Sequence, residues 1–207
     1  MVTNVKYYPT VYGIGYIGDG KYKSRNNGKH TTQYRYWHNM MNRCYGRICY
    51  KNPSKNRKYK DCSVCDEWIN FQNFAKWFDE NYYEIDGDKM CLDKDILRKG
   101  NKIYSPNSCV FVPNRINILF IKSDKLRGDL PIGLTYHKRD NKIDVYCNTN
   151  RNQEFLGRFN INEIEEAFNA YKQFKENYIK QVAEEYKDKI PKKLYEAMYK
   201  YEVEITD

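Results

Sequence analysis

The sequence predicts an α+β fold, and three observations point to it. Apolar residues recur at helical spacing in two segments of the first half. Short apolar pieces separated by turn residues follow between residues 90 and 120, and three more lie between residues 132 and 159. A long amphipathic pattern then begins near residue 160. We therefore expect small sheets with flanking helices, followed by a three-stranded antiparallel sheet backed by a long helix.

The composition fits one average domain or two small ones. The chain has 207 residues, of which 41% are hydrophobic and 21 are Tyr. Eighteen consecutive apolar residues occur nowhere, which excludes a membrane span, and the first thirty residues lack the apolar core of a secretory signal. We therefore expect a cytoplasmic protein without a membrane partner. In that reducing setting, the seven Cys indicate core thiols or metal ligands before disulfides.

The net charge of +9 is unevenly placed. Residues 1–60 carry 13 basic residues and one acidic residue, whereas residues 161–207 carry 8 basic and 11 acidic residues. A basic segment rich in Tyr and Asn indicates a polyanionic partner, most simply nucleic acid. The alternative is an ordinary solvated basic face.

The first half divides into an arm and two helices. Residues 1–33 are basic and rich in Tyr and Gly, which predicts an irregular arm with room for one short hairpin. Residues 34–45 place four residues on one helical face, and residues 66–80 carry an aromatic stripe at helical spacing. The stripe indicates a core. The two sets are Trp37, Met40, Met41 and Cys44, then Trp68, Phe71, Phe74, Ala75 and Phe78.

Residues 90–120 read as strand, loop, strand and helix. The strands lie near Met90–Leu92 and Cys109–Val112, and a helix follows Pro113. The charged segment 122–131 ends in Gly and Pro, which favours a domain boundary. The predicted domains are an arm (1–33), a first module (34–122), a second module (130–190) and a C-terminal helix (191–207).

The second module contains three β-like pieces and a long helix. The pieces are 132–136, 143–147 and 154–159, and turn residues separate them. Asn160 then caps the long helix, with Glu163 at the capping-box position. Pro191 starts a final helix that runs from Lys192 to about Tyr201.

Residues 90–117 resemble the ββα module of HNH endonucleases. The motif order is Leu92-Asp93-Lys94-Asp95, then Gly100-Asn101, then Tyr104 to Cys109, then Val112 to Asn117. Trp37 to Cys44 and the Cys65-x-x-Trp68 helix match phage-borne relatives, so the resemblance covers roughly residues 30–120. It implies that Asp93 and Asn117 hold Mg²⁺ or Mn²⁺ and that Asn101 steadies the loop. The metal would neutralise charge on the scissile phosphate.

One residue departs from that pattern. Lys94 stands where the general-base His belongs, and a protonated Lys is a poor base at neutral pH. Either the scaffold has become a DNA-binding module, or another group activates water, with Asp95 the nearest alternative base or ligand. Turn and cap chemistry is a further explanation of Asp93, Asn101 and Asn117.

Residues 133–171 resemble the Apetala-type DNA-binding domain. The matching residues are Gly133-Leu134, Tyr136, the strand 143–147, Leu156 to Phe159, and the helix residues from Glu166 to Tyr171. The resemblance implies a three-stranded sheet that enters the major groove, which admits such a ribbon. The strand Trp of the family is absent, and Asp144 sits where an acid is unwelcome. An ordinary small α+β domain is the alternative. The implied DNA-binding residues are Tyr136, Lys138, Arg139, Lys142, Tyr146, Arg151 and Arg158, and on the first helix Arg35 and Arg43.

Cys62 and Cys65 have the spacing of metal ligands. A structural zinc site usually needs a second pair, and the remaining Cys form no second Cys-x-x-Cys. We therefore do not expect structural Zn²⁺.

Together these patterns predict a double-stranded DNA-binding protein of phage homing-endonuclease type, located in the host cytoplasm. It would be a weak or inactive Mg²⁺- or Mn²⁺-dependent phosphodiester hydrolase. The alternative is a non-enzymatic phage regulator, or a host-takeover or anti-defence factor that binds DNA or a host protein. RNA in place of DNA is a third hypothesis, given the many Tyr.

Overall fold

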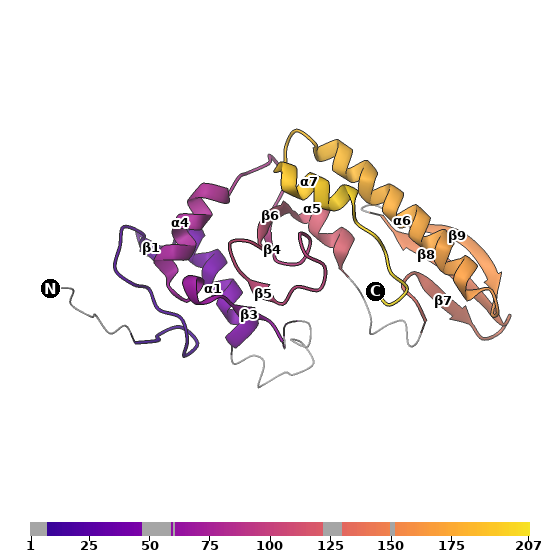
Figure 1. The fold of residues 1–207 in the computed structure, drawn as a ribbon, viewed down its shortest axis with the longest axis horizontal. Coiled ribbons are helices and arrows are strands. Elements are labelled where there is room, and N and C mark those ends of the chain that lie inside the picture. Colours follow the sequence, from indigo (N-terminus) through magenta and orange to yellow (C-terminus); the bar gives the residue numbers. More distant parts are fainter. Residues whose placement is uncertain (1–7, 47–58, 60, 122–129, 150–151) are drawn as a thin grey trace. The chain divides into compact units, whose positions relative to one another are not determined.

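The computed structural model describes residues 8–46, 59, 61–121, 130–149 and 152–207 (Figure 1). The chain forms two compact units. Unit 1 comprises Met1–Glu84 and Leu92–Phe111, and unit 2 comprises Ile85–Cys91 and Val112–Asp207. The fold is mixed α+β and includes one three-stranded antiparallel sheet, as the sequence predicts.

Three helices build the core of unit 1: α1 (Thr32–Tyr45), α3 (Asp66–Ile69) and α4 (Phe71–Asn81). The predicted face of α1 is buried at Trp37, Met40 and Met41. The sequence predicts a single helix over residues 66–80, and this is wrong. Asn70 adopts an extended backbone between α3 and α4, where its Oδ1 accepts the Gln72 N–H at 2.9 Å. The aromatic stripe is nevertheless the core, because Trp68, Phe71, Phe74 and Phe78 are all buried.

The described part of the arm contains the short hairpin that the sequence predicts. Strands β1 (Arg25–Asn26) and β2 (Lys29–His30) pair antiparallel. The two turn residues, Asn27 and Gly28, both have positive φ, at 48° and 77°. This is the type I′ geometry that suits a two-residue hairpin, and it explains the Asn-Gly pair.

The segment 90–120 has the predicted order of elements. Strands β4 (Met90–Asp93) and β6 (Val110–Pro113) form a two-stranded sheet, and α5 (Asn114–Asn117) and the 3₁₀ helix η2 (Ile118–Phe120) follow. A parallel pair, β3 (Ser63–Val64) with β5 (Ile103–Tyr104), was not predicted. Both strands are two residues long, too short for any periodicity.

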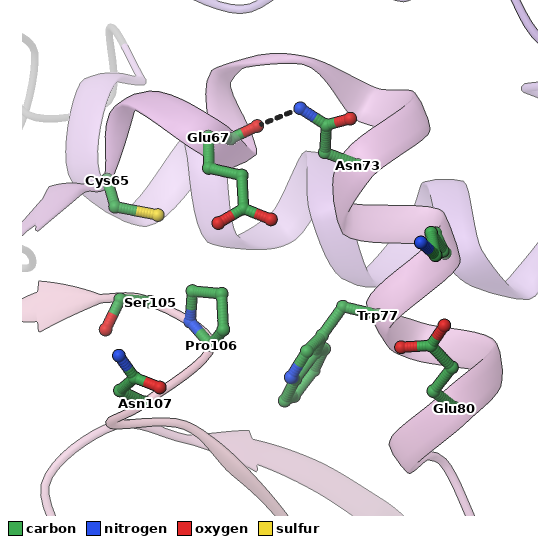
Figure 2. Close-up of a pocket in the computed structure, with 9 residues that line it drawn as sticks. Cys65, Glu67, Asn73, Trp77, Glu80, Ser105, Pro106 and Asn107 are labelled. Carbon is green, nitrogen blue, oxygen red and sulfur yellow. Dashed lines mark hydrogen bonds between the residues drawn. The ribbon is translucent and has the colours of Figure 1, made fainter.

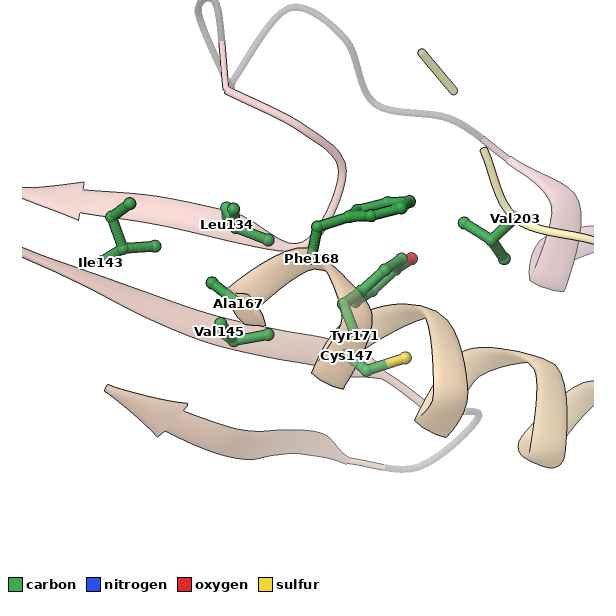
Figure 3. Close-up of a cluster of buried hydrophobic side chains, with 8 residues drawn as sticks. All are labelled: Leu134, Ile143, Val145, Cys147, Ala167, Phe168, Tyr171 and Val203. Carbon is green, nitrogen blue, oxygen red and sulfur yellow. The ribbon is translucent and has the colours of Figure 1, made fainter. Parts of the chain in front are cut away.

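Unit 2 is the predicted three-stranded sheet backed by a long helix. Its antiparallel order is β7 (Leu134–His137), β8 (Lys142–Asn148) and β9 (Gln153–Asn160), and α6 (Ile164–Tyr186) packs on it (Figure 1). Figure 3 shows the core between sheet and helix. A shorter helix, α7 (Lys192–Tyr199), follows Pro191 as predicted. The core residues are Leu134, Ile143, Val145, Cys147, Ala167, Phe168, Tyr171 and Val203.

The predicted N-cap of α6 at Asn160 is wrong by three residues, because the N-cap is Glu163. Asn160 ends β9, and the helix begins at Ile164. Half of the predicted capping box is present, because the Glu163 carboxylate accepts the Asn160 backbone N–H at 2.7 Å. The strand therefore continues through the residue whose side chain the sequence assigns to the helix cap.

Among the described residues, none of the helices has both the length and the apolar character needed to cross a membrane. Most of the predicted boundary at 122–131 and the candidate Arg151 lie outside the described residues. The predicted domain limits stay predictions.

Candidate nucleic-acid interface and the loop of residues 93–104

The two faces of the unit 2 sheet differ in character. Side chains alternate between faces along a strand, and Ile143, Val145 and Cys147 of β8 are buried in the core beneath α6. Lys142, Asp144 and Tyr146 therefore lie on the opposite face, which we call the outer face. Residues directly opposed across strands share a face, so the register adds residues from β7 and β9. These are Thr135 and His137 of β7, and Phe155, Arg158 and Asn160 of β9.

A buried acid holds an arginine at the centre of the outer face. Both Asp144 oxygens accept hydrogen bonds from Arg158, at 2.6 Å from Nε and 2.8 Å from Nη2. The Asp144 side chain is 1% exposed, whereas that of Arg158 is 46% exposed. His137 Nε2 lies 3.1 Å from the same carboxylate. The hydrogen bonds from Arg158 hold the pKa of Asp144 below its usual range. The acid that seemed unwelcome in the sequence thus fixes the orientation of a half-exposed guanidinium.

An aromatic pair lies beside this arginine. A β-bulge between Val145 and Tyr146 shifts the register, which sets Phe155 opposite Tyr146, with ring centroids 5.3 Å apart. Gly157 supplies the φ of 147° within the bulged strand. The Phe155 side chain keeps 56% of its surface exposed. The alternation of side chains does not predict Phe155 on this face, because the bulge interrupts it. The local sign of the bulge is Gly157, since a glycine inside an apolar strand often marks one.

Three other candidates lie near the β7–β8 turn. Lys138 and Arg139 are exposed in the turn itself. Lys142 donates to Asn160 Oδ1 on the outer face. Lys138 and Arg139 are therefore exposed basic side chains near this end of the sheet, whereas Lys142 is hydrogen-bonded to Asn160.

Tyr136 lies on the other face from the remaining candidates. Its cross-strand partner is Ile143, a residue of the core, and its hydroxyl donates to Asn141 Oδ1 at 2.8 Å. The structure therefore brings Tyr146, Lys142 and Arg158 together and leaves Tyr136 on the side of α6.

The two candidates on α1 have different surroundings. Arg35 is exposed, and its Nη2 donates to Thr32 Oγ1 at 3.2 Å. Arg43 is half-buried, donates from Nη1 to the Tyr104 hydroxyl at 3.4 Å, and lies over the Tyr59 ring. Arg43 thus contributes to packing within unit 1, whereas Arg35 faces solvent.

The loop between β4 and β5 is closed by Lys94 and Asn101. The Asn101 Nδ2 donates to Lys94 O and Ile103 O, both at 2.7 Å. The Lys94 Nζ donates to Asn101 O at 2.9 Å and to Asp95 Oδ2 at 3.1 Å. The Lys94 side chain is 8% exposed and that of Asp95 is 48% exposed. The hydrogen bonds of Asn101 and Lys94 therefore hold the two sides of this loop together.

The residues near Asp93 do not fit a divalent metal. Asp93 Oδ1 accepts the backbone N–H groups of Asp95 and Ile96, at 2.9 and 2.8 Å. Burial, together with the Asp95 charge, raises the pKa of Asp93 to about 6. The ammonium of Lys94 meets Asp95, the nearest other carboxylate. Mg²⁺ is usually bound by one or two carboxylates together with waters and phosphate oxygens. Here Asp93 Oδ1 is already used by two backbone N–H groups, and the Lys94 ammonium beside Asp95 repels a cation.

Asn117, the other implied metal ligand, belongs to unit 2. It is the last residue of α5 and is half-buried. No cluster of three His, Cys, Asp or Glu suited to a metal occurs in the part of the chain that the structure describes. We derive no catalytic step through a metal from this arrangement.

Cys62 and Cys65 flank the short strand β3. Cys62 is buried and Cys65 is half-buried, and burial raises the pKa of both thiols. A zinc ligand binds as the thiolate, and among the described residues these two Cys belong to no cluster of three or more metal-binding side chains.

Cys65 also lies at the rim of a cavity of about 480 Å³ in unit 1 (Figure 2). Trp77 forms one wall and Pro106 another. Asn73 of α4 donates a hydrogen bond from Nδ2 to the backbone oxygen of Glu67 in α3, at 2.9 Å. Two carboxylates, Glu67 and Glu80, outnumber the single Lys76. The cavity therefore disfavours a polyanion, and its protonated thiol is a weak nucleophile without a lining His to activate it. Ser105 and Asn107 complete the lining.

Comparison with known proteins gives no family. No family model, curated protein or solved structure shows a significant match to the chain. The resemblances to HNH endonucleases and to Apetala-type domains therefore stay predictions.

Proposed function

We propose that the chain binds double-stranded DNA and that the outer face of the β7–β8–β9 sheet contacts the major groove. The observation that carries the proposal is the Asp144–Arg158 pair, in which a buried carboxylate orients a half-exposed guanidinium. The major groove admits a β-ribbon, and Arg is the commonest reader of guanine there. Holding Arg158 in one orientation lowers the entropy lost when it binds.

The neighbouring residues support the same partner. Phe155 and Tyr146 offer an exposed aromatic surface beside the guanidinium, and such surfaces contact thymine methyl groups. Lys138 and Arg139 are exposed at the end of the sheet, within the same turn, where they suit phosphate contacts that set the register of the complex. Together they give the face base-directed and phosphate-directed groups.

We propose further that DNA binding proceeds without cleavage. Lys94 takes the position of the general base, and its ammonium donates to Asn101 O and Asp95. It therefore does not accept a proton from water. Asp93 accepts two backbone N–H groups and serves as a turn residue. The segment 90–117 then acts as a scaffold for DNA binding.

The binding proposal is tested by fluorescence anisotropy with labelled duplex DNA of mixed sequence. Phe155→Ser should weaken binding roughly tenfold, because fully burying a Phe side chain contributes about 1.5–3 kcal/mol. Ile205→Ser is the matched control, since Ile205 is similarly exposed but lies at the C-terminus. Equal affinities of Phe155→Ser and the wild type would contradict the sheet as the contact surface.

Arg158 needs a paired design, because its loss leaves Asp144 buried without its partner. Arg158→Gln and the double variant Asp144→Asn/Arg158→Gln are compared. The double variant should recover the stability of the fold and still bind DNA weakly. Full DNA affinity in the double variant would show that Arg158 does not contact DNA.

The absence of cleavage is tested by incubating supercoiled plasmid with the protein and Mg²⁺ or Mn²⁺. We expect no nicking. Nicking that disappears in Asp93→Ala and in Asn117→Ala would overturn the scaffold interpretation and establish a metal-dependent hydrolase.

A further inference from the structure

We infer that unit 1 carries a second, separate contact surface for the phosphodiester backbone of duplex DNA. It consists of basic side chains on the segment before α1, on the β1–β2 hairpin and on the first turns of α1, and we call it the basic hairpin surface. The inference extends the proposed function, since it adds a contact region with a different chemical role. Its residues are Lys21, Lys23, Arg25, Lys29 and Arg35.

The backbone beneath these side chains is anchored. Gln72 of α4 is buried, and its amide donates to Ile17 O at 3.2 Å and to Tyr22 O at 2.9 Å. Its Oε1 accepts the Tyr22 N–H at 3.0 Å. Thr31 Oγ1 donates to Lys23 O at 2.9 Å. A segment that reads as an irregular arm in the sequence is thus held on the core of unit 1 and presents its lysines from a fixed position.

A cavity of about 280 Å³ opens between this segment and α1. Its lining is rich in hydrogen-bond donors, and Lys21 and Lys23 supply two positive charges. None of its lining residues is acidic. The Thr31 hydroxyl already donates to Lys23 O, and the Gln33 amide donates to Asp79 Oδ1 at 2.9 Å. The two ammonium groups are therefore the main donors for a phosphate group, with Tyr22 and Asn26 beside them. The other lining residues are Tyr22, Asn26, Thr31, Gln33 and Phe71.

The hairpin extends the positive charge beyond the cavity. Arg25 and Lys29 are exposed on either side of the Asn27-Gly28 turn. The contacts of Arg25 to Gly28 O and to the His30 ring are both 3.4 Å long, so a phosphate displaces them at little cost. Residues 8–35 contain five Lys and Arg against one acidic residue, Asp19. Duplex DNA, with about one negative charge per 1.7 Å of axis, complements this density.

The basic hairpin surface and the sheet have different roles in this scheme. Lys and Arg on a hairpin contact phosphates and give affinity that depends on salt but not on sequence. The outer face of the sheet carries Phe155 and Arg158, which contact base edges in this proposal. The two surfaces therefore separate in experiments that vary salt and sequence.

The test measures the salt dependence of DNA affinity for the full chain. Lys21→Gln/Lys23→Gln/Arg25→Gln should lower the slope of log K against log salt by roughly 2–3, because each lost phosphate contact lowers it by about 0.9. Binding should weaken roughly tenfold or more, equally for all duplex sequences. Circular dichroism and urea unfolding verify that the exposed substitutions leave the fold intact.

The matched control is Lys189→Gln/Lys193→Gln/Lys200→Gln. It removes the same charge from exposed lysines of unit 2 in and around α7, and its slope should stay within experimental error of the wild type. An unchanged slope in the hairpin variant, or an equal loss in the control, overturns the inference. A loss confined to RNA ligands overturns it as well.

The outcome is distinguishable from that of the proposed function. If Phe155→Ser binds like the wild type while the hairpin variant loses salt dependence, the sheet proposal fails and the inference stands. If Phe155→Ser weakens binding and the hairpin variant does not, the sheet proposal stands and the inference fails. A wild-type chain that does not bind duplex DNA overturns both.

Discussion

The loop of residues 93–104 and the outer face of the sheet each contain an ion pair, and the two pairs are inverted. In the loop the cation is inside: Lys94 is 8% exposed and Asp95 is 48% exposed. On the sheet the anion is inside: Asp144 is 1% exposed and Arg158 is 46% exposed. In both regions the buried residue of the pair, Lys94 or Asp144, stabilises the local structure. The exposed residue, Asp95 or Arg158, presents its charge to solvent.

This difference bears on which region suits DNA. The loop pair turns its carboxylate, Asp95, outward and uses its cation internally at Asn101 O, although the loop also exposes Arg98, Lys99 and Lys102. The sheet presents a guanidinium that Asp144 orients and whose Nη1 lies 3.5 Å from the half-exposed carboxylate of Asp140. A residue's charge alone therefore does not predict a DNA contact; its burial and its partner do.

The largest expected effect comes from removing the buried acid of the sheet. Asp144→Ala should lower the free energy of unfolding by about 2–3 kcal/mol, because it removes two charge-assisted hydrogen bonds from a buried position. Urea unfolding at neutral pH measures the change. Arg158 should also lose its fixed orientation, so DNA affinity should fall in the same variant. A change in stability below about 0.5 kcal/mol would contradict the fastening role of Asp144.

The same pair predicts a dependence on pH. Because the folded-state pKa of Asp144 lies below 3.8, its stabilisation is fully present above that value and is lost as the pH falls through the folded-state pKa. In a His137→Gln background, which removes the other titratable group at this carboxylate, the difference in stability between Asp144 and Asp144→Asn should therefore be constant near neutrality and shrink below about pH 4. A difference that grows on acidification would contradict the assigned sign.

The loop pair should have a smaller effect. Lys94→Met removes a donor to Asn101 O and the contact to Asp95, but the half-exposed Asp95 regains water. We expect a loss of about 1–2 kcal/mol in the free energy of unfolding. Lys102→Met, at an exposed neighbouring position, should change stability by less than about 0.5 kcal/mol. Equal effects of the two substitutions would show that Lys94 does not fasten the loop.

The sequence predicts those parts of the fold that local periodicity determines. The face of α1 and the three strands of unit 2 are of this kind, since each spans enough residues for a pattern to repeat. The break at Asn70 and the pairing of β3 with β5 depend on tertiary contacts, and no local pattern marks them. Asp144 and Phe155 show the same limit in the candidate site. Nothing in the local sequence around Asp144 indicates that it pairs with Arg158 of the neighbouring strand. A one-residue bulge moves the Phe155 side chain to the other face of the sheet.

Lys175 is a third buried charged residue, and it differs from Lys94 and Asp144 in its lack of an ion-pair partner among the described residues. Lys175 of α6 is buried, and no ion pair forms with it among the described residues. Burial lowers the pKa of Lys175, and the neighbouring Cys147 thiol offsets this only in part. A Lys with a lowered folded-state pKa destabilises the fold at neutral pH, and the penalty disappears as the pH rises from the folded-state pKa toward 10.5.

Lys175→Met should therefore raise the free energy of unfolding by about 1 kcal/mol at neutral pH, since Met keeps the aliphatic stem and removes the unpaired ammonium. Thermal unfolding measures the gain, which should decline as the pH approaches 10.5. The exposed Lys189→Met should shift stability by less than about 0.5 kcal/mol at any pH. Destabilisation by Lys175→Met would mean that the buried ammonium has a stabilising partner, like those of Lys94 and Asp144, and the contrast between paired and unpaired buried charges would then not hold.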